Sequence, residues 1–183
     1  MNKLSSQEVA VLRQDNEKLK SQLNELITIA QENEELNQRI QRLITALTNT
    51  ESLDEFFNIL YSTLNNELNT DAVVIRWFDV LGSNFKHKEF VEYDAQIFSL
   101  FDEILENKQA ICGQLKPEQL AYLFPKIKVA SAVLIPLGVD KPLGLLAMAS
   151  HDRKRFHSEM STDFLIYLGN IISNLLRMWT RNR

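Results

Sequence analysis

The chain has 183 residues, which is room for one domain and an appendage, and its 45% of apolar and 24% of charged residues exclude global disorder. The net charge of −4 argues against a protein that coats nucleic acid. The single cysteine, Cys112, excludes an intramolecular disulfide and fits a reducing cytosol. The first twenty residues lack the apolar run of a signal peptide, and the most apolar late stretch, 164–179, is too short and polar to span a bilayer. We therefore expect a cytoplasmic protein with neither a membrane nor a nucleic acid as partner.

The first seventy residues contain neither glycine nor proline, which is typical of long helices. With Leu12 taken as heptad position d, nine of the twelve a and d positions up to residue 47 are apolar. Asn16 at an a position favours a parallel two-stranded coil. We expect residues 1–49 to form a coiled-coil helix that makes the protein a homodimer. The residues assigned to the dimer seam are Leu12, Asn16, Leu19, Leu23, Leu26, Ile40 and Leu47.

The seam weakens at Asn33 and Asn37, where a second apolar row begins at heptad position g. That row consists of Ile29, Leu36 and Leu43. A wider apolar face predicts that residues 29–47 also pack against another helix. The alternative is a surface helix that lies on its own domain, but forty residues exceed what a domain of this size can cover.

A second helix is predicted after a short polar break, with Ser52 and Glu55 as a capping box. Its apolar face consists of Leu53, Phe56, Phe57, Leu60, Leu64 and Leu68. Residues 72–80 are β-branched and aromatic and predict a strand, residues 81–84 a turn, and residues 85–93 a weaker second strand.

Asp94 is placed to cap a helix, and Pro117 suits the first turn of a short helix over 117–124. The apolar face of the first of these is Ile97, Leu100, Phe101, Ile104 and Leu105. Segments 130–139 and 142–150 predict two strands that are joined by a turn and buried on both faces. A last helix is expected from about Ser158 to Trp179. Its predicted apolar face is Phe164, Leu168, Ile171, Ile172, Leu175 and Trp179.

This order of elements predicts an α+β domain over residues 50–183, with a mostly antiparallel sheet flanked by helices.

Ser150, His151 and Asp152 are the residue types of a hydrolytic triad, side by side in the sequence. Neighbouring residues on a strand point to opposite faces, and no G-x-S-x-G elbow is present, so we expect no catalytic residues and no enzyme. The preferred interpretation is that Asp152 closes a turn by accepting backbone amides and Phe156 fills the core. Residues 153–155, Arg-Lys-Arg, are expected on a solvated turn, with a phosphate or partner contact as the alternative.

The three histidines, His87, His151 and His157, show no metal-ligand spacing with Cys112, and the chain has no glycine-rich phosphate loop. We therefore expect no metal and no cofactor. Cys112 is interpreted as a small buried residue, with a redox or ligand-contact role as the alternative.

The stretch SAVLIPLGVDKPLGLLAMASHDRKRF, residues 131–156, lies between a helical middle segment and a closing helix and resembles a GAF domain. Residues 16–43, 112–125 and 144–176 together resemble a bacterial GAF-like family catalogued as domain of unknown function 484. The resemblance implies a curved antiparallel sheet that carries helices, and a dimer. It brings no established activity.

In GAF domains, ligands lie between the sheet and the helical middle segment, here residues 94–124. Such pockets are mostly apolar with a few polar anchors, and Tyr93, Cys112, Tyr122 and Ser131 would line one here. The alternative is a filled core without a ligand.

Two functions follow from these expectations. The first is a dimeric scaffold or adaptor that acts through its coiled coil on an unidentified protein partner. The second is a sensor that binds an unidentified small molecule in the GAF pocket and signals through helix pairing.

Overall fold

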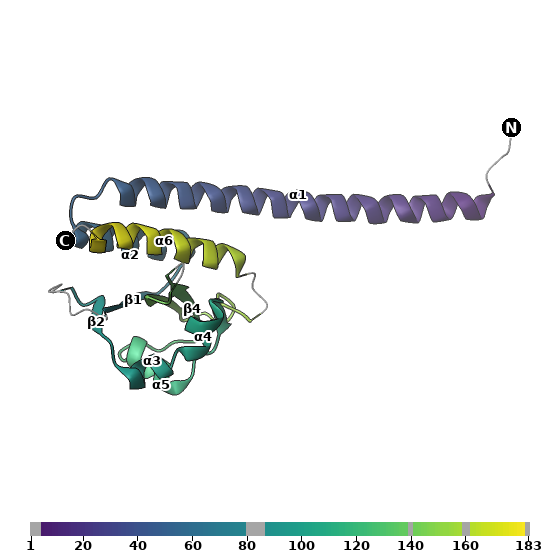
Figure 1. Cartoon of the computed structure of the whole chain (residues 1–183). Coiled ribbons are helices and arrows are strands. Elements are labelled where there is room, and N and C mark those ends of the chain that lie inside the picture. Colours follow the sequence, from purple (N-terminus) through teal and green to yellow (C-terminus); the bar gives the residue numbers. More distant parts are fainter. Residues whose placement is uncertain (1–4, 80–86, 139–140, 159–161, 182–183) are drawn as a thin grey trace. The chain divides into compact units, whose positions relative to one another are not determined.

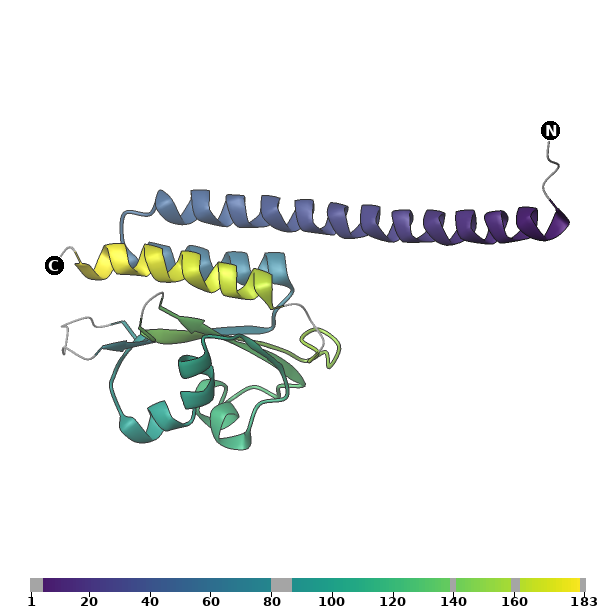
Figure 2. The ribbon, with the colours of Figure 1, turned by 45° about the vertical axis from the view of Figure 1, so that its right-hand side comes forward.

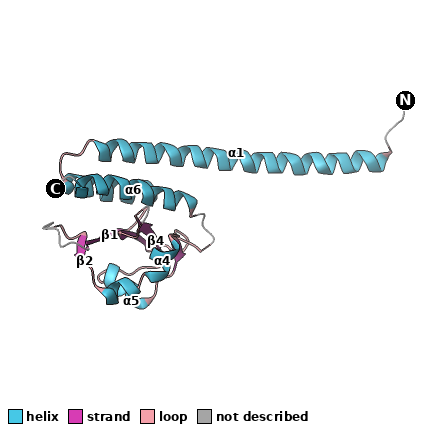
Figure 3. Ribbon diagram, viewed as in Figure 1, coloured by secondary structure: helices cyan, strands magenta, loops and turns pink. Residues whose placement is uncertain are grey.

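The computed structural model describes residues 5–79, 87–138, 141–158 and 162–181. The chain divides into two compact units, residues 1–42 and 43–183. The first unit is helical, and the second combines helices with a sheet (Figure 3). No helix in these described ranges is both long and apolar enough to cross a bilayer.

The long N-terminal helix, α1 (Ser6–Thr48), confirms the helix predicted for the glycine-free and proline-free region. Ser5 and Glu8 form a capping box at its start, because each side chain accepts a hydrogen bond from the other residue's backbone N–H. The sequence places the domain boundary after residue 49, whereas the second unit begins inside α1, at Leu43. The reason is that Leu43 and Leu47 are buried in the core of the second unit.

Helix α2 (Leu53–Leu68) confirms the second predicted helix, and all six residues of its predicted apolar face are buried. The Ser52 hydroxyl accepts a hydrogen bond from the Glu55 N–H at 3.2 Å, as predicted. The Glu55 carboxylate reaches one residue further than expected and accepts from the Glu51 N–H. The helix ends at Asn69, which adopts the left-handed conformation with φ of 49°.

The sheet has five strands in the order β2-β1-β5-β4-β3. These are β1 (Ala72–Asp79), β2 (Phe90–Glu92), β3 (Ile111–Gly113), β4 (Ser131–Leu137) and β5 (Gly144–Ser150). Three neighbouring pairs are antiparallel, whereas β2 runs parallel to β1, so the sheet is mixed. The second strand is shorter than predicted within the described residues, because the chain still turns at His87, whose carbonyl accepts from the Phe90 N–H.

Helices cover both faces of this sheet (Figures 1 and 2). On one face, α2 and α6 (Asp163–Arg181) pack on inward residues such as Ile75, Ile135 and Met148 to form the α2/α6 core. On the other face, three short helices, α3 (Ala95–Ser99), α4 (Asp102–Asn107) and α5 (Pro117–Leu123), pack on Ala132, Leu134 and Ala147 to form the α3–α5 core. Burial on both faces explains why β4 and β5 are almost continuously apolar, and it confirms the prediction made for them.

The middle segment differs from the single helix predicted after Asp94. Asp94 does cap a helix, accepting from the N–H groups of Gln96 and Ile97. That helix, α3 (Ala95–Ser99), ends after one turn, and α4 (Asp102–Asn107) begins beyond Phe101. Phe101 is completely buried, and the carbonyl of Leu100 at the break accepts a hydrogen bond from the buried Gln119 side chain. Gln119 belongs to α5 (Pro117–Leu123), which begins at Pro117 as predicted.

Helix α6 begins at Asp163, later than predicted, and residues 159–161 lie outside the described residues. Its fully buried apolar residues are Leu165, Leu168, Ile172 and Leu176. The predicted face is therefore correct at Leu168 and Ile172, which are buried. It is also correct at Phe164, Leu175 and Trp179, which are partly buried and pack against the α2/α6 core. Ile171 is only partly buried, and the buried Leu165 and Leu176 were not predicted. Gly169 and Ser173 set the rotation, because these two small buried residues form the side of α6 that approaches β4.

Candidate functional site

The end of β5 is tied to the start of β1 through Asp71. One carboxylate oxygen of Asp71 accepts from the Ser150 hydroxyl at 2.9 Å and from the His151 N–H at 2.7 Å. The His151 ring does not pair with Ser150: its Nδ1 lies 2.6 Å from the carbonyl of Lys128. These hydrogen bonds lower the pKa of the exposed Asp71 carboxyl below its usual value. Both Ser150 and His151 are thus engaged in holding strands together rather than arranged as nucleophile and base.

The turn after β5 follows the prediction made for Asp152 and Phe156. The Asp152 carboxylate accepts from the Lys154 N–H at 2.9 Å, and Phe156 is 1% exposed in the α2/α6 core. The buried Ser131 hydroxyl donates to the Asp152 carbonyl and accepts from the Phe156 N–H. This hydroxyl therefore fixes the turn on the first residue of β4.

The prediction that residues 153–155 form a solvated turn is correct for Arg153 and Lys154, which are exposed, and wrong for Arg155. The Arg155 side chain is half-buried and donates through Nε and Nη2 to the carbonyl of Leu68. Leu68 is the last residue of α2, so Arg155 satisfies a carbonyl that the end of a helix leaves without a partner.

An open pocket of about 480 Å³ lies beside this turn. We call it the β5-exit pocket, and it is lined by Gly113, Gln114, Leu115, Leu120, Lys128, Val129, Ala130, Ser131, His151 and Arg153. Its walls come from the end of β3, from α5, from the segment that enters β4 and from the turn that leaves β5. A volume of this size is in the range of small-molecule sites.

The structure does not bring together the four residues predicted to line a ligand pocket. Ser131 lines the β5-exit pocket. Cys112 pairs in register with Val133 and faces the α2/α6 core, on the opposite side of the sheet. The Tyr122 ring lies 5.9 Å from the Phe101 ring in the α3–α5 core, and the half-exposed Tyr93 packs against Phe98.

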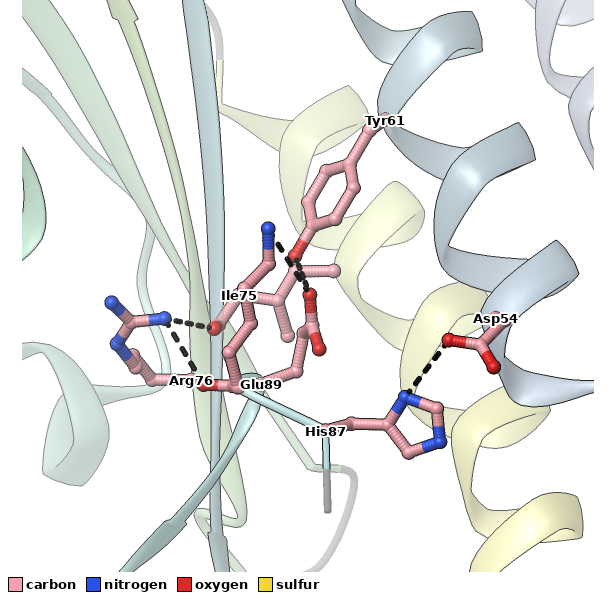
Figure 4. A network of polar contacts seen from close by, with 7 residues as sticks. Asp54, Tyr61, Ile75, Arg76, His87 and Glu89 are labelled. Carbon is pink, nitrogen blue, oxygen red and sulfur yellow. Dashed lines mark hydrogen bonds and ion pairs between the residues drawn. The ribbon is translucent and has the colours of Figure 1, made fainter. Parts of the chain in front are cut away.

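Sequence reasoning missed a second polar group, centred on Glu89 (Figure 4). The Glu89 side chain is buried, and its carboxyl accepts from the Tyr61 hydroxyl at 2.7 Å, with the Lys88 Nζ 4.0 Å away. Burial and the hydrogen bond to Glu89 raise the pKa of Tyr61 far above its usual value. At the edge of the same group, His87 Nδ1 lies 3.4 Å from Asp54. No motif marks these residues, because they come from α2 and from the short segment before β2.

Burial raises the pKa of the Cys112 thiol, and it also raises the pKa of Tyr122. A raised thiol pKa disfavours the thiolate, which is the nucleophilic form of cysteine. Within the described ranges, no three side chains of His, Cys, Asp or Glu lie close enough together to hold a metal ion.

The first unit carries a row of exposed leucines along α1. Leu12, Leu19, Leu23 and Leu26 are between 56% and 64% exposed, and Asn16 lies exposed between them. The remaining two residues assigned to the seam, Ile40 and Leu47, are buried in the single chain. The unpartnered part of the predicted seam is therefore its N-terminal part.

Two comparisons with known proteins bear on these features. The search of curated proteins matches none to this chain. A family model described as "Protein of unknown function, DUF484" matches residues 2–181, so it spans both units and includes the exposed leucine row and the β5-exit pocket. The chain is therefore a member of the DUF484 family.

Proposed function

We propose that the protein is a homodimeric, GAF-like scaffold in which α1 pairs with α1 of a second copy as a parallel coiled coil. The observation that carries this proposal is the exposed row of Leu12, Leu19, Leu23 and Leu26. Leaving such a stripe in water forfeits the burial that normally stabilises a long helix. A second copy supplies the same stripe in the same spacing, which makes the pairing self-complementary.

Asn16 supports the choice of two parallel strands. In a parallel pair, the two Asn16 side chains meet each other at the same a position, and a buried asparagine there penalises other registers and oligomeric states. The row ends before Leu43, where the same helix enters the core of the second unit. A dimer of this kind carries two sheet-containing domains and presents both to one protein partner.

A charge-insertion variant tests the pairing. Leu19→Asp with Leu26→Asp places two carboxylates per chain in the seam, and we expect the molar mass in solution to fall to that of one chain, 21.2 kDa. The second unit keeps its fold, which near-ultraviolet circular dichroism measures, because both substitutions lie outside it.

The matched control is Ser21→Asp with Thr28→Asp. These exposed positions lie on the same helix, at heptad position f, away from the seam. The control inserts the same charges and leaves the mass unchanged. Partner proteins that bind the control but not the Leu19/Leu26 variant require the dimer. Equal binding of partners by both variants would contradict the scaffold role.

A second candidate function is a sensor of a small molecule, and the β5-exit pocket favours it. The pocket includes Ser131 and lies beside Phe156, which the Ser131 hydroxyl contacts and which belongs to the core shared with α2 and α6. A ligand in the pocket would therefore lie next to a hydroxyl that is hydrogen-bonded to Phe156, which packs in the same core as α2 and α6.

A further inference from the structure

Two cationic side chains, Lys128 and Arg153, line the β5-exit pocket. Lys128, His151 and Arg153 are all exposed lining residues, from two segments that meet beside the sheet. No aspartate or glutamate is among the ten residues that line the pocket. Two carboxylates belong to residues bonded to or next to lining residues: Asp71 accepts from the Ser150 hydroxyl and the His151 N–H, and Asp152 accepts from the backbone of Lys154.

The floor of the pocket is apolar. Leu115 is buried, and Leu120, Val129 and Ala130 are half-buried around it. The Ser131 hydroxyl is buried with them, but it already donates to the Asp152 carbonyl and accepts from the Phe156 N–H. The floor therefore offers contact area, and the exposed rim offers the donors.

The hydrogen bond of the His151 ring fixes which of its nitrogens carries a proton. Because the carbonyl of Lys128 can only accept a hydrogen bond, Nδ1 of His151, 2.6 Å away, carries a proton and donates it. This bond also joins the backbone of the segment that bears Lys128 to the segment that bears Arg153, so the two segments are held together without a ligand. Segments that are already joined need not be brought together when an anion binds, which lowers the entropic cost of binding.

From this arrangement we propose that the β5-exit pocket binds a small organic anion, with its carboxylate or phosphate group at Lys128 and Arg153 and its apolar body on Leu115, Leu120 and Val129. The pocket volume of about 480 Å³ accommodates a ligand of roughly ten to twenty non-hydrogen atoms. The inference refines the sensor function and is independent of the pairing of α1.

The test is a titration of the full chain, labelled with ¹⁵N, with phenyl phosphate and 3-phenylpropionate, and with uncharged 3-phenylpropanol of the same apolar body. We expect the two anions to shift backbone amide resonances of Gly113, Gln114, Val129 and Ala130. The alcohol binds at least about tenfold more weakly, because it cannot make charge-assisted hydrogen bonds. Inorganic phosphate alone also binds more weakly than phenyl phosphate, because it leaves the floor uncovered.

Two sets of variants assign the charges. Lys128→Gln with Arg153→Gln removes both fixed charges from the rim and weakens binding of both anions at least about tenfold. Lys126→Gln with Lys154→Gln is the matched control, because these exposed lysines flank the same segments and do not line the pocket. All four side chains are exposed, so both variants keep the fold, which the spectrum itself reports.

Several results would overturn the inference: equal affinity for the alcohol and the anions, shifts that centre outside the pocket, or equal weakening by both pairs of substitutions. No shift with either anion at millimolar concentration would do the same. The Leu19→Asp, Leu26→Asp chain binds the anions as the native chain does, so a failure of the pocket and a failure of α1 pairing are distinguished in one set of proteins.

Discussion

Tyr61 and Glu89 show how a single side-chain contact stabilises the junction between α2 and the edge of the sheet. Glu89 is 3% exposed, and the Tyr61 hydroxyl donates to its carboxyl. The Glu89 carbonyl in turn accepts from the Trp77 N–H, so the same residue also begins the pairing of β2 with β1. Glu89 therefore couples α2 to the segment before β2 through its carboxyl group, and that segment to β1 through its backbone carbonyl.

Removing the Tyr61 hydroxyl leaves that buried carboxyl without one of its hydrogen-bond donors. We expect Tyr61→Phe to lower the free energy of unfolding by about 1–3 kcal/mol, measured by urea denaturation. Tyr167→Phe, on the exposed side of α6, is the control and changes it by less than about 0.5 kcal/mol. Equal effects of the two substitutions would show that the hydrogen bond to Glu89 contributes nothing specific.

Asp71 makes the stability of the fold depend on pH in the acid range. Its pKa is lowered in the folded chain, so the contribution of its carboxylate is fully present above the unfolded pKa of about 3.9. That contribution is lost as the pH falls through the lower, folded pKa. We expect Asp71→Asn to lower the Tm at pH 7 and this difference to shrink as the pH falls below about 4. A difference in Tm that stays constant with pH would contradict this account.

At the residue scale, the sequence predicts contacts between near neighbours and misses those between distant segments. Ser52, Asp94 and Asp152 were assigned correctly, because each accepts an N–H two or three residues away and turn chemistry determines such contacts. Tyr61 and Glu89 are 28 residues apart, and Arg155 lies 87 residues from Leu68. These contacts depend on the packing of whole elements, which no local pattern encodes.

Helix α6 owes its orientation to a close approach that the sequence pattern does not reveal. Its partly buried Phe164, Ile171 and Leu175 are as apolar as the buried Leu165 and Leu176, so periodicity alone allows more than one inward face. Gly169 decides between them, because a Cβ at this position would lie 2.6 Å from Ile135 Cγ2 and 3.0 Å from the Pro136 carbonyl oxygen. The absence of a side chain lets α6 lie directly on β4.

Gly169→Ala therefore sets two effects against each other. Alanine gains about 1 kcal/mol over glycine as a helix former, whereas overpacking a full core typically costs about 1–3 kcal/mol. Since one of the contacts is to backbone, which cannot move aside, we expect a net loss of stability, measured as a lower Tm. The control is Asn170→Ala, at the exposed neighbouring position, which keeps or raises the Tm. A Tm increase in Gly169→Ala would contradict the close approach.

Elements with a strong pattern were predicted well, and elements held by a few tertiary contacts were not. Strands β4 and β5 are almost continuously apolar, and helix α2 has a single apolar face. Each of these patterns is compatible with only one arrangement. The break between α3 and α4 depends on Gln119, nineteen residues from the Leu100 carbonyl that it satisfies. The residues assigned to the candidate pocket are not brought together for a similar reason: Cys112 and Tyr122 are close in sequence but lie on opposite faces of the sheet.

At the scale of the whole molecule, the leucine row of α1 is exposed in the single chain. The heptad spacing of the proposed seam is visible in the sequence, because such a spacing is a local repeat. Where the seam stops was not readable, because Leu43 and Leu47 continue the same apolar pattern but belong to the core of the second unit. We therefore propose that the dimer seam consists of Leu12, Asn16, Leu19, Leu23 and Leu26.

Sedimentation equilibrium of the native full-length chain, over a range of concentrations in dilute neutral buffer, tests this central claim most directly. The account predicts a molar mass of twice 21.2 kDa, with dissociation only at the lowest concentrations. A mass of 21.2 kDa at every concentration would show that the leucine row does not pair with a second copy, and the proposed dimer would be wrong.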